Sequence, residues 1–336
     1  MQKRSPVAPQ LAILLSTVLW GTLWIPVRRL HELGSEGEAW TTIGFVIPLA
    51  FLLPAAIRRR HRILLALRDL GNAGFWLALG IALYVEGVTR GEVARVILLF
   101  YLTPVWSTLL ARIVLGDAIT RRRFVTMVLG VAGMLVIFGA EGGYPVPRSS
   151  ADWMGLVAGF AWGVALVFSR REKPQPLFDR LFVHWGVALV FSRREKPQPL
   201  FDRLFVHFVF LGPVFFCVTL LPGGGSPPNF ELTSSAELLG WAVALALGWM
   251  LPVLWLTSVG ASQVPPGRFA ILLMFEVVVG LTTAALLTEE RLAPREYIGA
   301  LLILSAIGTE FVIKPSTTPN PSPDPTATTS FRGRER

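Results

Sequence analysis

The sequence predicts an all-α integral membrane protein of about ten transmembrane helices, arranged as two inverted five-helix repeats. Three observations lead to this prediction. The chain is 53% hydrophobic and only 16% charged, whereas a soluble domain carries about 25% charged residues. The apolar residues gather in runs close to the roughly 20 residues that a helix needs to cross a bilayer. Residues 93–138 and 266–311 also match each other weakly at a shift of 173 positions.

The apolar runs fill almost the whole chain and leave no room for a soluble domain. They do not alternate apolar and polar residues, so we expect helices and not the strands of a barrel. The expected spans are 11–27, 40–57, 71–88, 93–115, 124–140, 153–168, 204–221, 238–257, 269–287 and 297–313.

The two halves correspond at individual positions. The shift of 173 residues places Arg95 on Arg268, and an upstream match places Trp20 on Trp162. Five helices per half is an odd number, so the second half must enter the membrane from the opposite side. Inverted repeats of this kind are typical of secondary transporters, which bind their substrate between the two halves.

We expect the first repeat to comprise residues 1–140 and the second residues 152–314. Within the second, residues 162–184 recur without change as 185–207, which adds a segment between the sixth and seventh spans. The apolar part of this segment would form a helix of about 16 Å, too short to cross the bilayer. We therefore expect it at the cytoplasmic interface or in a re-entrant dip. Residues 315–336, rich in Pro, Thr and Ser, are expected to form a disordered cytoplasmic tail.

The net charge of +9 lies mainly in loops on one side of the predicted helices. Arg58, Arg121 and Arg170 belong to these loops, which share a face with the N-terminus. This positive-inside pattern predicts a multi-pass protein of the cell (inner) membrane with cytoplasmic N- and C-termini. The basic residues form no continuous stripe, which argues against nucleic-acid binding.

Glu276 is the most informative single residue. It lies within the ninth span, where a carboxylate costs roughly 2.5–3.5 kcal/mol to insert. It must be protonated, paired or exposed to a wet cavity. We expect it to bind substrate or couple transport to protons. The structural alternative is a neutral acid that is hydrogen-bonded to a neighbouring helix.

A group of further residues is expected to line the substrate cavity beside Glu276. These residues are Trp20, Trp24, Tyr101, Thr103 and Trp162. Trp20 and Trp162 occupy equivalent positions in the two halves, and Thr103 is the counterpart of Glu276. The alternative for the aromatic residues is packing, or anchoring at the membrane interface.

Glu86 ends the third span and Arg95 opens the fourth. The two residues are candidates for an ion pair that acts as a gate or has a structural role, and the alternative is that both lie among lipid headgroups. Pro104 and Pro252 interrupt the fourth and eighth spans, where we expect bends because proline removes a helical hydrogen bond.

The sequence has no motif for metal-dependent hydrolysis, serine hydrolysis or nucleotide binding, and we expect no cofactor and no metal. Its one cysteine, Cys217, excludes an intrachain disulfide. Two alternatives to a carrier remain open, a membrane-embedded enzyme and a non-transporting membrane sensor or scaffold.

The sequence resembles the EamA-like ten-helix branch of the drug/metabolite transporter superfamily. The residues that carry this resemblance are Trp20-Gly21 and the segments 98–105, 115–117, 275–277 and 288–292. The resemblance implies export or exchange of small metabolites or drugs through a central cavity lined by spans one, three, four, six, eight and nine. The expected partners are a small-molecule substrate and the lipid bilayer.

Overall fold

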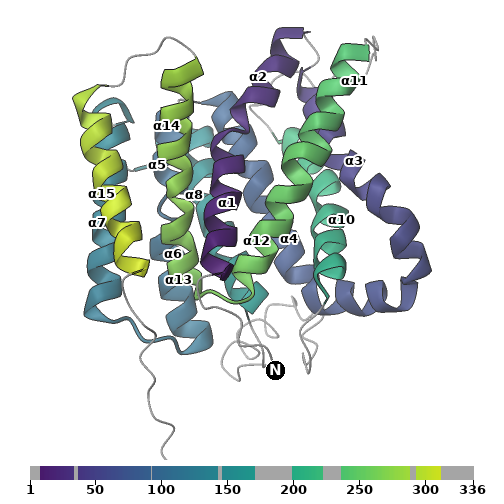
Figure 1. Ribbon diagram of the computed structural model, residues 1–336, viewed down its shortest axis with the longest axis horizontal. Helices are drawn as coiled ribbons and strands as arrows, with labels where there is room; N and C mark the ends of the chain where they lie inside the picture. The colour runs from purple at the N-terminus through teal and green to yellow at the C-terminus, as the bar shows by residue number, and fades with distance from the viewer. Residues whose placement is uncertain are drawn as a thin grey trace, which may run out of the picture.

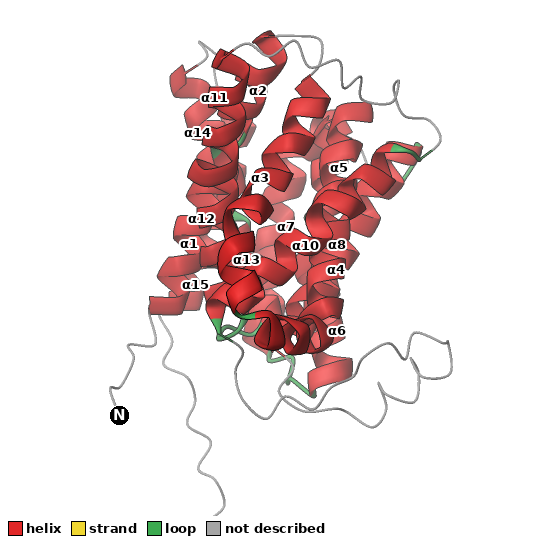
Figure 2. Cartoon of the chain, turned by 90° about the vertical axis from the view of Figure 1, so that its right-hand side faces the viewer, coloured by secondary structure: helices red, strands yellow, loops and turns green. Residues whose placement is uncertain are grey.

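A computed structural model describes residues 8–33, 37–91, 93–142, 146–170, 199–221, 236–287 and 293–311. All secondary structure in these residues is helical. The helices stand side by side as one bundle (Figures 1 and 2). Most of the duplicated segment and the expected tail lie outside the described residues.

The first half of the chain contains α1 (Ala8–Gly21), α2 (Trp24–Leu33), α3 (Gly37–Arg58), α4 (Arg60–Arg90), α5 (Val93–Phe100), α6 (Thr103–Leu110), the π-helix η1 (Ala111–Leu115) and α7 (Arg121–Gly142). The second half contains α8 (Ser150–Arg170), α10 (Leu200–Thr219), α11 (Ala236–Val243), the π-helix η2 (Ala244–Met250), α12 (Leu251–Ala261), α13 (Pro266–Leu273), α14 (Phe275–Leu287) and α15 (Pro294–Phe311).

Seven helical stretches in the described residues are long and apolar enough to cross a membrane. They are Ala8–Leu30, Arg60–Val88, Arg95–Leu115, Ser150–Arg170, Leu200–Thr219, Ala236–Ala261 and Pro266–Leu287. A shorter apolar helix covers Ile43–Arg58 and overlaps the expected second span. The helices α7 and α15 occupy the remaining two expected positions and pack against each other at one edge of the bundle (Figure 1). The prediction of a multi-helix membrane protein is therefore confirmed.

Several expected spans are interrupted instead of continuous. The first breaks after Gly21, the fourth after Phe100 and the ninth at Met274. Pro104 lies in the first turn of α6, directly after the second of these breaks, and Pro252 lies in the first turn of α12 after η2. Proline is tolerated there because the first amides of a helix have no intrahelical partner. A turn at residues 101–102 precedes Pro104, whereas Pro252 follows a change from the π-helix η2 to α12 within one helical stretch.

Small residues set the closest helix contacts. A side-chain carbon on Gly133 of α7 would lie 2.7 Å from the carbonyl oxygen of Gly299 of α15. Gly21 of α1 similarly lies against the backbone of α14. Association in lipid depends on such close packing, because the hydrocarbon chains are as apolar as the side chains.

Both terminal helices reach the same end of the bundle. Figure 1 shows the start of α1 and the end of α15 at its lower end. The crossings between them also bring the end of α3, Arg58, and the start of α7, Arg121, to this end.

Candidate functional site

The two broken helices place their interruptions at corresponding positions. The helix α5 runs from Val93 to Phe100 and α13 from Pro266 to Leu273, bounds that differ by the same 173 residues that relate the two sequences. In Figures 1 and 2, α5 lies above α6 whereas α13 lies below α14, so the two broken helices run in opposite directions.

Glu276 lies in the first turn of α14, immediately after the break. Two backbone hydrogen bonds form the turn at this break. The Met274 amide donates to the Ile271 carbonyl and the Val277 amide donates to the Met274 carbonyl, each at 3.2 Å. Backbone amides at a helix start lack intrahelical partners and carry a partial positive charge. The break therefore favours an acidic side chain at this depth, where a continuous helix would not.

Aromatic rings pack around this region from four helices, α1, α4, α5 and α8. The rings of Trp20 and Trp162 make an edge-to-face contact with centroids 5.7 Å apart. Phe100 lies 5.8 Å from Trp162 and 5.2 Å from Tyr101, and Tyr84 lies 4.6 Å from Phe100. We call these five residues the aromatic cluster. Edge-to-face pairs of this kind hold the rings in fixed relative positions.

Three members of the aromatic cluster have polar atoms without a hydrogen bond in the described part of the chain. They are the indole nitrogens of Trp20 and Trp162 and the hydroxyl of Tyr101. All three side chains are buried, with 7%, 3% and 2% of their surface exposed. Buried polar atoms are normally hydrogen-bonded, so three orphans in one cluster require an explanation.

Glu276 faces this cluster. Its carboxyl group interacts electrostatically with the hydroxyls of Tyr84 and Tyr101. The Tyr101 hydroxyl is near enough to share a hydrogen bond with the carboxyl, but in the present geometry it does not make one.

Thr103 and Trp24 have different surroundings from the other candidates. The Thr103 hydroxyl donates to the Phe100 carbonyl at 2.5 Å and approaches the Gly159 carbonyl at 3.3 Å. Thr103 therefore satisfies the backbone of the break and links α6 to α8. The indole nitrogen of Trp24 donates to the Thr283 hydroxyl at 3.2 Å, which links α2 to α14.

Of the predicted cavity residues, the structure brings Glu276, Trp20, Tyr101 and Trp162 together. The sequence analysis missed Tyr84 and Phe100. Phe100 could have been identified, because it precedes Tyr101 in segment 98–105, which carries the family resemblance. No feature of the sequence singled out Tyr84. In the described residues, no group of three His, Cys, Asp or Glu side chains could hold a metal ion.

Glu86 and Arg95 are both buried, and each bonds to a partner other than the one expected. Glu86 lies 2.7 Å from Arg90 on the next turn of α4. The Nη2 and Nε atoms of Arg95 donate to Oδ2 of Asp152 at 2.9 and 3.2 Å. The expectation of a Glu86–Arg95 pair thus overlooked Asp152, because distance along the sequence does not show that α8 packs beside α5.

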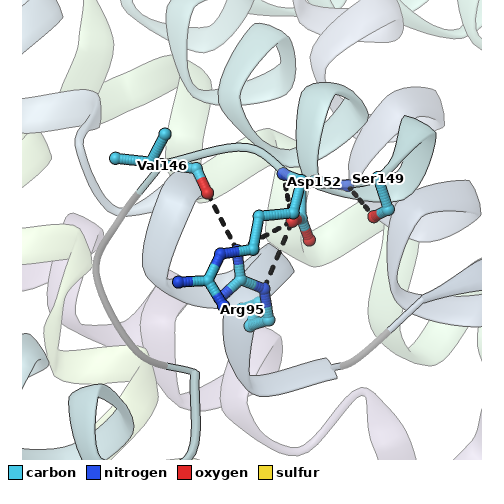
Figure 3. Close-up of polar contacts among 5 residues, drawn as sticks. Arg95, Val146, Ser149 and Asp152 are labelled. Carbon is cyan, nitrogen blue, oxygen red and sulfur yellow. Dashed lines mark hydrogen bonds and ion pairs between the residues drawn. The ribbon is translucent and has the colours of Figure 1, made fainter.

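Asp152 is held in place by several groups besides Arg95 (Figure 3). The Arg148 amide donates to its carboxylate at 2.8 Å, and the Asp152 amide donates to the Ser149 hydroxyl at 3.1 Å. Arg95 in turn donates to the Val146 carbonyl at 2.8 Å. Charged groups buried in this way are stable only when their hydrogen bonds are satisfied, and this network satisfies them.

Comparison with known proteins agrees with this architecture. Residues 8–139 match the EamA-like transporter family. A protein of Archaeoglobus fulgidus described as an uncharacterized transporter is 26% identical over 170 residues, which are 49% of this chain and 58% of the relative. This chain thus spans little more than half of that relative's length.

A solved structure titled only as the crystal structure of a protein superposes with a TM-score of 0.63. It is 16% identical and covers 92% of this chain and 98% of its own, a likeness that shows the fold alone. The family matched by residues 8–139 is one of transporters and not of enzymes. The described helices are those of a multi-pass membrane protein, and its residues 8–139 match the EamA-like transporter family.

Proposed function

We propose that this protein is a secondary transporter that exports small organic solutes across the cell membrane by alternating access. The observation that carries this proposal is the position of Glu276. Its carboxyl group lies at a helix break and faces a buried aromatic cluster with three unpartnered polar atoms. Interrupted helices at the midplane are typical of transporter binding sites, because they expose backbone and charge where a solute can reach them.

Helix pairing supports two equivalent halves. The helix α8 packs on α4, α5 and α6, and α1 packs on α12, α13 and α14. The two sets correspond when each span is matched with the span five places later: α1 then matches α8, α4 matches α12, and α5 and α6 match α13 and α14. The starts of α1 at Ala8 and α8 at Ser150 differ by the same 142 residues that separate Trp20 from Trp162.

Individual contacts support the same correspondence. A side-chain carbon on Gly21 would lie 2.8 Å from Cβ of Val279, and one on Gly163 would lie 3.3 Å from Cβ of Trp106. Gly163 is the counterpart of Gly21, and Trp106 is the counterpart of Val279. The contact between α1 and α14 is therefore repeated between α8 and α6.

The Trp20–Trp162 contact indicates where the pseudo-two-fold axis passes. Two equivalent residues can touch each other only near the axis that relates them. Their edge-to-face contact at 5.7 Å thus puts the axis beside the aromatic cluster. A solute bound there would lie between the two halves, where rocking of one half against the other exposes it to each side in turn.

The unpartnered atoms indicate what the site can offer a solute. The two indole nitrogens are hydrogen-bond donors, the Tyr101 hydroxyl is both donor and acceptor, and the Glu276 carboxylate is an acceptor. A small organic molecule with an apolar body and one or two polar groups would satisfy them. Glu276 can exchange its proton for such a group, which would couple solute movement to protons.

The arginine distribution supports cytoplasmic termini. Arg58, Arg121 and Arg170 lie at the helix ends that share a side with the start of α1. Positive residues concentrate on the cytoplasmic side of membrane proteins.

The first step of the test is to find a ligand. Thermal-shift screening of the purified protein against amino acids, nucleosides, sugars and cationic drugs identifies binders, because a ligand of the native state raises the melting temperature. A hit is then followed as flux in proteoliposomes with an imposed pH gradient.

The decisive variant is Glu276→Gln, which keeps the shape of the side chain and removes its charge. We expect flux to fall at least tenfold and to lose its dependence on the pH gradient. The matched control is Glu237→Gln, because Glu237 is about half exposed and pairs with the equally exposed Arg29. Unchanged flux and pH dependence in Glu276→Gln would remove this residue from the mechanism. A protein that binds a ligand and never moves it would favour a sensor.

A further inference from the structure

Arg268 repeats the contact that Arg95 makes. The side-chain amide of Gln10, with its oxygen toward Arg268, accepts hydrogen bonds from Nη2 at 2.9 Å and from Nη1 at 3.1 Å. Gln10 lies in the first turn of α1 and Arg268 in the first turn of α13. Arg95 and Asp152 likewise lie in the first turns of α5 and α8.

The two contacts join equivalent residues. Arg268 follows Arg95 by 173 positions, the shift that relates α13 to α5. Asp152 follows Gln10 by 142 positions, the shift that relates α8 to α1. Each half of the chain thus supplies an arginine that binds the first turn of the other half's leading helix. We call Arg95–Asp152 the first latch and Arg268–Gln10 the second latch.

The two latches lie at opposite ends of the bundle. Three traverses, by α1 with α2, then α3, then α4, separate Gln10 from Arg95 along the chain. Figure 1 shows the start of α1 and α13 at the lower end, and α5 in the upper part. One latch therefore lies at each end of the bundle.

The latches differ in chemistry. The first joins a guanidinium to a carboxylate, whereas the second joins a guanidinium to a neutral amide. Both are charge-assisted, because the arginine is ionised in each, and only the first also brings a negative charge to the arginine. The first latch has supporting bonds from Arg148 and to Val146. Both latches are formed in this structure.

We propose that the two latches are alternating gates, one for each face of the protein. Opening one face separates α1 from α13, and opening the other separates α8 from α5. This inference rests on the proposed alternating-access function and adds the residues that regulate it.

The test moves the carboxylate from one latch to the other. Gln10→Glu makes the second latch an ion pair, and Asp152→Asn makes the first one neutral. The double variant keeps the total charge and should strengthen the second latch while it weakens the first, which guards against a single variant that fails to fold. Gln263→Glu, at an exposed position, and Asp117→Asn, which loses its pairing with Arg170, are the matched controls.

The measurement is hydrogen–deuterium exchange of the protein in lipid nanodiscs, with no substrate required. In Gln10→Glu, exchange should slow roughly tenfold in the peptides of α1 and α13 and rise in those of α5 and α8, because the carboxylate adds attraction between opposite charges to the hydrogen bonds of Arg268. Asp152→Asn should produce the reverse. Two coupled gates predict this opposite change at the far face, whereas a static structural contact changes only its own surroundings.

The outcomes separate the two proposals. Wild-type flux together with purely local changes in exchange would overturn the latch inference and leave the transport function standing. Reciprocal changes in exchange without flux of any screened ligand would support the latches and count against transport.

Discussion

The substitution Gly21→Ala tests whether close contact between α1 and α14 holds Glu276 in position. The added carbon would lie 2.6 Å from the Glu276 carbonyl oxygen and 2.8 Å from Cβ of Val279. This oxygen distance is about 0.8 Å shorter than an ordinary contact. Since the oxygen is a backbone atom, it cannot rotate away, and the two helices must separate.

The expected steric cost is about 1–3 kcal/mol, the range for overpacked interiors. Alanine also favours the helix over glycine, by about 0.5–1 kcal/mol, so the effect must be measured against a control that gains the same amount. Gly240→Ala provides it, because a side-chain carbon at Gly240 of α11 meets no atom within 4 Å. The difference in the free energy of unfolding between the two variants isolates the steric cost.

Unfolding of both variants in mixed detergent micelles, followed by circular dichroism, measures that difference. We expect Gly21→Ala to be less stable than Gly240→Ala by about 1–3 kcal/mol, and solute flux to fall with it because the carboxyl of Glu276 moves. Equal stability of the two variants would refute the close contact. Lower stability with normal flux would refute its link to Glu276.

The remaining predictions concern other contacts of the bundle. Gly299→Ala should destabilise the α7–α15 pair by about 1–3 kcal/mol in the same unfolding assay, since its new carbon would lie 2.6 Å from the Gly133 carbonyl oxygen; a neutral result would mean that this pair is loosely packed. Trp24→Phe should cost about 1 kcal/mol through the lost bond to Thr283, and the double variant with Thr283→Val should add little; additive losses would show that the bond does not matter. Deletion of residues 171–193, which restores a single copy of the duplicated unit, leaves the sequences of α8 and α10 unchanged and should retain native melting temperature and flux; loss of folding in the same detergent would show that the duplication is needed.

The composition and periodicity of the sequence were sufficient to predict the membrane helices, because the free energy of inserting a helix is the sum of local contributions from its own residues. The resemblance at 93–138 and 266–311 predicted two related halves. Glu276 could be singled out because an acid within an apolar run is costly wherever it points. The same reasoning placed Thr103 and Trp24 at the cavity but could not identify their contacts with Gly159 and Thr283, which depend on which helices are neighbours.

The tertiary structure decided which of these residues meet. Trp20, Tyr101 and Trp162 come from three spans, and only the crossing and rotation of those helices bring their rings beside Glu276. The same packing pairs Arg95 with Asp152, while Glu86 pairs with Arg90 on its own helix. Insertion into lipid is governed by each segment's own residues. A contact between two helices depends on close packing of both surfaces, and the order of residues along the chain does not show which two surfaces meet.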